Sequence, residues 1–193
     1  MGKQIYLRKI EELFKKSPVV NYASLERIVK HAKNTDYTKQ LVRNLLLKGK
    51  IQRLTKGFYT LHTNPQLAVF CFKPAYLGLQ DALSYHNLWE QETIPIIITA
   101  RKIRPGIRKV LGMNILVRRL EKKYYFGFEY VDESGLYFPY SDVEKTVIDM
   151  VYFKEKLSDD TLRNIKGILN KKKLSTYLKH YPRRIRNMVL KIF

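Results

Sequence analysis

Residues 34–61 have the sequence NTDYTKQLVRNLLLKGKIQRLTKGFYTL, which predicts a helix followed directly by a tight basic hairpin. Four polar residues recur at the i, i+3, i+4 and i+7 spacing of one helical face: Asp36, Lys39, Gln40 and Arg43. The apolar residues fall on the opposite face: Leu41, Val42, Leu45 and Leu46. Gly49 suits a left-handed C-terminal cap, so the helix is predicted to end at Lys48.

Two short strands are predicted after this helix, at residues 50–54 and 58–61, around a turn that contains Gly57. Upstream, apolar residues near helical spacing predict helices over residues 4–16 and 22–31. Asn21 is the expected N-cap of the second helix. A cationic helix face beside a basic β-ribbon is the combination that reads the major groove of DNA. Residues 1–63 are therefore predicted to form a winged helix-turn-helix DNA-binding domain.

The predicted recognition helix supplies three candidates for base contacts, because Arg and Gln can bind base edges in a bidentate manner: Lys39, Gln40 and Arg43. Tyr37 and Asn44 flank this face and are candidates for contact with phosphate or a thymine methyl group. Arg53 and Lys56 on the hairpin are expected to contact phosphate or the adjacent minor groove. Leu47 is expected to pack on the wing. The alternative is that the polar residues form an ordinary solvated helix face.

Basic residues are concentrated at the two ends of the chain, whose net charge is +20. Residues 1–63 hold 14 Lys and Arg against 4 Asp and Glu, and residues 157–193 hold 10 against 2. Residues 64–156 hold 13 against 11, so the middle of the chain is nearly neutral. Charge alone indicates only solubility and attraction to polyanions, including RNA or an anionic membrane surface. Together with the predicted helix, this distribution favours double-stranded DNA as the partner.

Residues 64–193 are predicted to form a larger α+β domain that ends in a basic helical tail, residues 157–193. A helix is predicted over residues 76–88, and strands over residues 93–100, 114–119, 124–131 and 136–140. A capping box at Ser141-Asp142-Val143-Glu144 is expected to open a helix that ends near Phe153. The tail carries a second basic set, which is either a second phosphate surface or a soluble helix face: Lys171, Lys172, Lys173, Arg183, Arg184 and Arg186.

The length of 193 residues is enough for one large domain or two small domains, each able to bury a core. Cys71 is the only cysteine, which excludes an intrachain disulfide, and its apolar neighbours predict a buried thiol. The longest hydrophobic run, residues 94–100, is too short to cross a bilayer, and no N-terminal signal is evident. We therefore expect a cytoplasmic protein.

Carboxylates in the strand-rich region raise the alternative of a metal-dependent nuclease: Glu129, Asp132, Glu133, Asp142 and Glu144. No pair of them is followed by a lysine at the strand spacing of such enzymes, and Glu144 is expected to form the capping box with Ser141. The histidines have no cysteine or second histidine at ligand spacing. We therefore predict no catalytic residues, no metal site and no cofactor.

A resemblance to a known family is carried by short segments along the chain: Lys48-Gly49-Lys50-Ile51, Lys56-Gly57-Phe58-Tyr59, YLGLQDALSYHNL at residues 76–88, Ile94-Pro95-Ile96, and DVEKTVID at residues 142–149. The pattern Ala82-Leu83-x-x-His86-x-Leu88 and the tripeptide Glu144-Lys145-Thr146 are the most specific of these. Over roughly residues 5–155 the chain resembles the AbiEi-type antitoxins of type IV toxin–antitoxin systems.

This resemblance implies a winged-helix N-terminal domain, a larger C-terminal antitoxin domain, and repression of the protein's own operon at inverted repeats. It also implies a functional partner, a toxin with a nucleotidyltransferase fold, which the antitoxin need not contact directly. The tail after Ser158 is less typical of the family. We expect a sequence-specific DNA-binding transcriptional repressor rather than an enzyme. A nuclease that uses the same reader domain and an RNA-binding module are the alternatives.

Overall fold

The computed structural model describes residues 2–29 and 35–193, apart from the side chains of residues 2–5 and 35. The described residues form helices and two β-sheets, which confirms the predicted α+β class. The chain divides into two compact units, residues 1–71 with 109–113 (unit 1) and residues 72–108 with 114–193 (unit 2). The sequence predicted the boundary between residues 63 and 64. In the structure the boundary lies later, because most of the apolar segment 65–72 belongs to unit 1.

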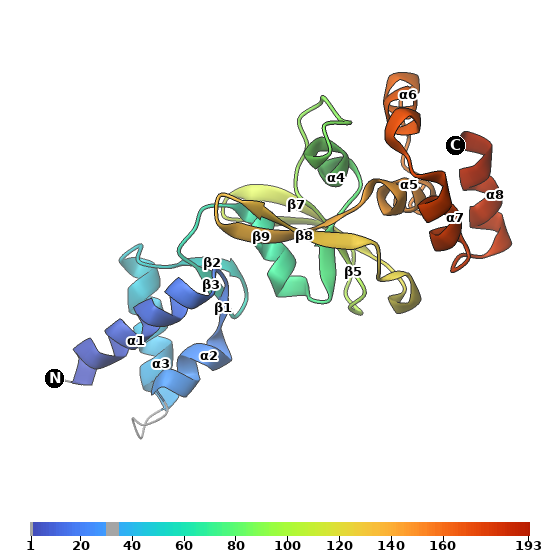
Figure 1. The fold of residues 1–193 in the computed structure, drawn as a ribbon. Coiled ribbons are helices and arrows are strands. Elements are labelled where there is room, and N and C mark those ends of the chain that lie inside the picture. Colours follow the sequence, from blue (N-terminus) through green and yellow to red (C-terminus); the bar gives the residue numbers. More distant parts are fainter. Residues whose placement is uncertain (1, 30–34) are drawn as a thin grey trace. The chain divides into compact units, whose positions relative to one another are not determined.

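Unit 1 contains a helical group and a small sheet (Figure 1). Its described elements are α1 (Gly2–Lys16), β1 (Val20–Asn21), α2 (Tyr22–Val29), α3 (Thr35–Leu47), β2 (Gln52–Thr55), β3 (Phe58–Thr60) and most of the 3-10 helix η1 (Pro65–Phe72). The helices share one core, to which α1, α2 and α3 contribute Phe14, Leu25 and Leu41 among others. The predicted end of the second helix at His31 lies outside the described residues.

The helix ends in unit 1 follow from local chemistry. Asn21 Oδ1 accepts a hydrogen bond of 2.8 Å from the Ser24 amide, which confirms Asn21 as the cap of α2. Gly49 has φ 64°, and the amides of Gly49 and Lys50 donate to the last carbonyls of α3, those of Leu46 and Leu45, at 3.0 and 2.9 Å. A left-handed glycine therefore ends α3 where the sequence predicts, within one residue.

The predicted hairpin is confirmed as β2 and β3, which pair antiparallel around Gly57 at φ 80°. The sheet has a third member that the sequence did not predict, because β1 pairs with β3 to give the order β1-β3-β2. The Tyr22 amide donates to the Gly57 carbonyl at 2.8 Å. This bond ties the tip of the hairpin to the first residue of α2.

Cys71 lies in η1 and is 3% exposed, as its apolar neighbours predict. Its thiol is hydrogen-bonded to the side chain of Thr55 on β2, so η1 packs on the hairpin. Burial raises the pKa of Cys71 from 9.0 to about 11, against the smaller effect of this hydrogen bond. The thiolate is therefore disfavoured in folded unit 1.

We expect the thiol reagent DTNB to react with Cys71 only when unit 1 unfolds, because the reactive thiolate is both buried and scarce. The raised pKa also predicts that unit 1 loses stability as the pH rises from 9.0 towards about 11, since the unfolded chain releases the thiol proton first. DTNB reaction rates measured against urea concentration check the first expectation, and urea unfolding followed by circular dichroism at pH values from 9.0 to about 11 checks the second. Rapid labelling without denaturant would contradict them.

Unit 2 is built on a mixed sheet with the strand order β6-β7-β5-β4-β9-β8. Its strands are β4 (Ala75–Leu77), β5 (Ile96–Thr99), β6 (Gly106–Val110), β7 (Met113–Arg119), β8 (Phe128–Glu133) and β9 (Leu136–Ser141). Residues 109–113, where β6 ends and β7 begins, belong to unit 1. β5 runs parallel to β7 and antiparallel to β4, and every residue of β5 is buried. This matches its isoleucine-rich sequence.

The predicted helix over residues 76–88 is wrong in its first part, which forms β4 before the short helix α4 (Gln80–Tyr85). Directly after β4, a Cβ added at Gly78 would lie 2.5 Å from Cδ1 of Ile98 on β5, so the Ile98 side chain fills the space that a larger residue would need there. The predicted strand over 124–131 also begins late, because the 3-10 helix η2 (Lys122–Tyr124) precedes β8. Strand β6 was not predicted.

The C-terminal helices of unit 2 are α5 (Val143–Tyr152), α6 (Asp159–Ile168), α7 (Lys171–Leu178) and α8 (Arg183–Ile192). Figure 1 shows α7 and α8 beside α5, and all of them contribute to one core with the sheet. The predicted helical nature of the tail is confirmed: Ser158 Oγ caps α6 by accepting from the Thr161 amide at 3.2 Å, and Pro182 directly precedes α8. The tail is therefore an integral part of unit 2.

Candidate nucleic-acid interface

Helix α3 divides into a buried side and an exposed side much as its spacing predicts. Leu41, Val42 and Leu45 are 4–5% exposed, and Leu46 is half-buried. The opposite side exposes four of the predicted contact residues to solvent: Lys39, Gln40, Arg43 and Asn44. The expectation that Leu47 packs on the hairpin is wrong, because its side chain is 75% exposed at the end of the helix.

The exposed face of α3 is mostly free of internal partners. Lys39 Nζ lies 3.2 Å from Asp36 Oδ1, but both side chains are more than 70% exposed, so this pair is weak. Gln40 and Arg43 make no side-chain hydrogen bond or ion pair with any other described residue. Tyr37 differs from them, because its half-buried ring packs against Tyr6 of α1 at a centroid distance of 6.0 Å.

The hairpin presents its own cations. Arg53 is exposed on β2, opposite Tyr59 of β3, and Lys56 is exposed at the turn. A register irregularity between Arg53 and Thr55 lets the strand bend before the turn. Because the turn is tied to the start of α2, Lys56 is held at a fixed place in unit 1.

A hollow of about 400 Å³ lies between α3 and the sheet of unit 1. Its lining comes from α2, α3 and the hairpin: Tyr22, Lys39, Val42, Arg43, Leu46, Arg53 and Tyr59. Three of these side chains are cations and the others are apolar or aromatic, so the hollow suits an anion attached to an apolar group. The Tyr22 hydroxyl is buried and has no hydrogen-bond partner among the described residues. Tyr22 and Tyr59 were not predicted to take part.

The carboxylates that raised the nuclease alternative have structural partners at three positions, the first of which is Asp132, whose Oδ1 accepts from the Gly135 amide at 2.7 Å. The predicted cap is wrong by one residue: Asp142 Oδ1, not Ser141, accepts from the Lys145 amide at 2.7 Å. Ser141 Oγ instead lies 2.7 Å from Thr146 Oγ1. Glu144 does not close a capping box either, since it accepts from the Asn170 amide at 2.8 Å. Among the described residues, no group of three or more His, Cys, Asp and Glu side chains could hold a metal ion.

The predicted second basic set is split by the structure. Lys173 Nζ lies 3.1 Å from Asp142 Oδ2 and 3.4 Å from Glu144 Oε2, so this lysine joins α7 to α5 rather than facing solvent alone. The other members are exposed on α7 and α8: Lys171, Lys172, Arg183, Arg184 and Arg186.

Unit 2 contains a fully buried pair of charged residues that the sequence did not predict. Lys145 and Asp149 form an ion pair one helical turn apart on α5, and both side chains are completely buried. The Tyr181 hydroxyl lies 3.1 Å from Lys145 Nζ, which also sits 5.4–5.8 Å from the ring centroids of Tyr76, Phe126 and Tyr181. Tyr76 donates to Asp149 at 2.6 Å. Burial lowers the pKa of Lys145 and raises that of Asp149, and their mutual attraction opposes both shifts.

In this lysine cluster (Lys145, Asp149, Tyr76 and Tyr181) the charged side chains are 0% exposed, so its role is to hold α5, β4 and the segment before α8 together. The sequence contained one signal for it. Most of the remaining positions of α5 are apolar: Val143, Val147, Ile148, Met150 and Val151. A helix that is apolar on all sides is buried, so its charged residues must pair internally.

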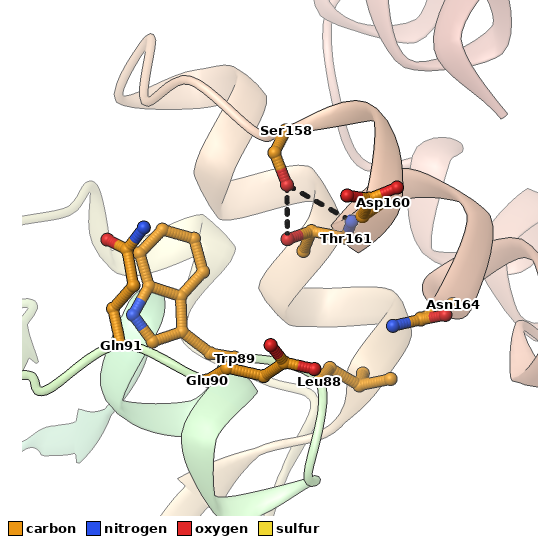
Figure 2. Close-up of a pocket in the computed structure, with 8 residues that line it drawn as sticks. All are labelled: Leu88, Trp89, Glu90, Gln91, Ser158, Asp160, Thr161 and Asn164. Atoms are coloured by element: carbon orange, nitrogen blue, oxygen red, sulfur yellow. Dashed lines mark hydrogen bonds between the residues drawn. The ribbon is translucent and has the colours of Figure 1, made fainter.

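A second hollow, of about 390 Å³, lies in unit 2 where α6 begins (Figure 2). Figure 2 shows the Trp89 indole facing the capping residues Ser158 and Thr161, whose hydroxyls lie 2.8 Å apart. The lining includes Glu90 and Asp160 but no lysine or arginine. This hollow therefore lacks the positive charge that a phosphate group requires.

Comparison with known proteins adds information on the fold alone. No family model matches the chain, and no curated protein matches it. Among solved structures, the crystal structure of the RV2827C protein from Mycobacterium tuberculosis is similar, with a TM-score of 0.63 and 12% sequence identity. The match covers 98% of this chain and 77% of that one. In the described part of the chain, no helix combines the length and apolarity needed to span a bilayer.

Proposed function

We propose that this protein is a sequence-specific, DNA-binding transcriptional repressor whose unit 1 is a winged helix-turn-helix domain. The observation that carries the proposal is the exposed face of α3, with Lys39, Gln40 and Arg43 free of the protein's own interior. The element order in unit 1, in which α3 is followed by a basic hairpin paired with β1, supports the same proposal.

The size of α3 suits the DNA major groove. Its 13 residues make a rod of about 20 Å, and the major groove, about 12 Å wide, admits one α-helix. In this mechanism Arg43 and Gln40 contact base edges, and Lys39 and Asn44 contact bases or backbone nearby. The hollow between α3 and the hairpin receives a phosphate with its sugar, because Arg53 and Lys39 supply charge and Tyr59 supplies an apolar wall. Lys56 contacts the backbone beside the helix.

Occupancy of a promoter by unit 1 would exclude RNA polymerase and so repress transcription. The resemblance to AbiEi-type antitoxins suggests that the promoter is the protein's own and that a nucleotidyltransferase-like toxin is encoded with it. Unit 2 would then supply the antitoxin action or contacts between copies bound at inverted repeats. A repressor of this kind works in the cytoplasm, without a cofactor.

The proposal is tested by fluorescence polarisation with the duplex upstream of the gene and a scrambled duplex of equal composition. We expect preference for the upstream duplex, together with competition by duplex DNA but not by duplex RNA, whose narrow major groove excludes a helix. Equal affinity for both DNA duplexes, or preference for RNA, would refute a sequence-reading repressor. Incubation of the protein with plasmid DNA and magnesium or manganese tests the nuclease alternative, which predicts that the plasmid is cleaved.

Affinity for the upstream duplex is expected to fall steeply with salt, with a slope of log affinity against log salt of about −5 or steeper. This slope follows if six or more phosphates are neutralised, since each contact contributes about −0.9 on B-form DNA. Polarisation titrations at several potassium chloride concentrations measure it. A nearly flat response would rule out the proposed role of the cationic residues in unit 1.

A further inference from the structure

The exposed side of α8 carries cations that nothing in unit 2 neutralises. Arg183, Arg184, Arg186 and Lys191 are exposed, and none of them forms an ion pair with another described residue. The chain contains no Asp or Glu after Asp160, so the sequence around α8 offers no nearby acidic residue. Lys173 differs from these residues, because it is half-buried between α7 and α5 and forms ion pairs with Asp142 and Glu144.

The opposite side of α8 is already used in the core. Val189 is fully buried, and Ile185, Met188 and Ile192 pack against the same cluster. A helix that binds a membrane surface needs a free apolar face to insert among the lipids. On α8, Leu190 is the one large apolar residue that is exposed, and it lies among the cations. The exposed side of α8 therefore offers charge rather than an apolar surface.

The position of these cations also argues against a purely structural role. Arg183 and Arg184 occupy the first turn of α8, and Lys171 and Lys172 occupy the first turn of α7. The positive end of the helix dipole lies there, so acidic residues stabilise that turn and basic residues oppose it. Both helices thus carry charge at an unfavourable place, and a bound anion would relieve the repulsion.

We propose that the exposed side of α8 binds backbone phosphates of duplex DNA without reading its sequence. Guanidinium groups suit this task, because they bind phosphate oxygens in a bidentate manner and remain charged at every physiological pH. The inference rests on the proposed function only in taking duplex DNA as the partner. It does not depend on sequence recognition by α3.

The test uses the full chain with the triple substitution Arg183→Gln, Arg184→Gln and Arg186→Gln. A matched control, Lys102→Gln with Lys122→Gln and Lys156→Gln, removes the same charge from exposed positions elsewhere in unit 2. We expect the arginine variant to bind the upstream and scrambled duplexes more weakly by the same factor, about tenfold or more in low salt. Its salt slope should become shallower by about 2.7, and the control should keep the wild-type slope.

The outcomes separate this inference from the proposed function. The fluorescence of Trp89, which packs against the core of unit 2, shows whether the variant is folded. A folded arginine variant with the wild-type slope would overturn the inference, even if the wild type prefers the upstream duplex. Binding of the wild type to phosphatidylglycerol vesicles instead of DNA would overturn it in favour of a membrane surface. Equal affinity for both duplexes, with the expected loss in the variant, would refute the repressor and support the phosphate surface.

Discussion

Replacing Asp149 by alanine is expected to destabilise unit 2 by about 3–5 kcal/mol, because it leaves the ammonium group of Lys145 buried without a counter-charge. Tyr76 would also lose the carboxylate to which it donates at 2.6 Å. The attraction of Asp142 on Lys145 is weaker, and the aromatic rings and the Tyr181 hydroxyl beside Lys145 do not neutralise a full charge. Urea unfolding followed by Trp89 fluorescence measures the loss, since Trp89 is the only tryptophan and lies in unit 2.

The control for this experiment is Asp160→Ala, which removes the partner of Arg163 on the surface of α6. Both side chains of that pair are more than 75% exposed, so the expected loss is below about 1 kcal/mol and comes mainly from the negative charge removed from the first turn of α6. The loss in Asp149→Ala should shrink as the pH rises towards 10.5, because the unfolded lysine then also gives up its proton. Equal stability of the two alanine variants would contradict the buried ion pair.

Replacing Arg43 by alanine is expected to lower the preference for the upstream duplex over the scrambled one by about 1–3 kcal/mol, roughly 5- to 150-fold. Arg43 is exposed on α3 and free of other described partners, so its loss removes a base contact without disturbing the core. Lys56→Ala, at the turn of the hairpin, should instead weaken binding to both duplexes about equally, because phosphate contacts carry no sequence information.

A matched arginine control is Arg8→Ala, on the exposed side of α1. It should leave the preference between the duplexes unchanged, as measured by polarisation at one fixed salt concentration. Losses for Arg43→Ala that are the same on both duplexes would remove α3 from the major groove, although unit 1 could still bind the backbone.

Unit 1 was predictable because its boundaries are set by short-range chemistry. Asn21 caps its own helix, Gly49 ends α3 in a left-handed conformation, and Gly57 turns the hairpin. Each of these signals acts within a few residues and therefore depends little on contacts with distant segments. The exposed cationic side of α3 followed from the 3.6-residue period in the same way. The hollow beside it did not, because Tyr22 and Tyr59 come together only when β1 joins the sheet.

Unit 2 was less predictable because its structure depends on contacts between distant segments. Residues 76–77 have an apolar sequence that fits a helix or a strand, and their pairing with β5 and β9 decides the matter. The cap of α5 shows a subtler failure. Ser141 and Asp142 are both good N-caps, and only the pairing of Ser141 within β9 leaves Asp142 free to take the position.

The lysine cluster has a consequence for the order in which the chain folds during its synthesis. Lys145 lies on α5, but the Tyr181 hydroxyl beside it comes 36 residues later in the chain and is therefore synthesised after it. Unit 1 draws on nothing beyond residue 113. We therefore expect nascent chains halted near residue 150 to hold a completed N-terminal unit beside a C-terminal one that is still open, accessible to chaperones and proteases.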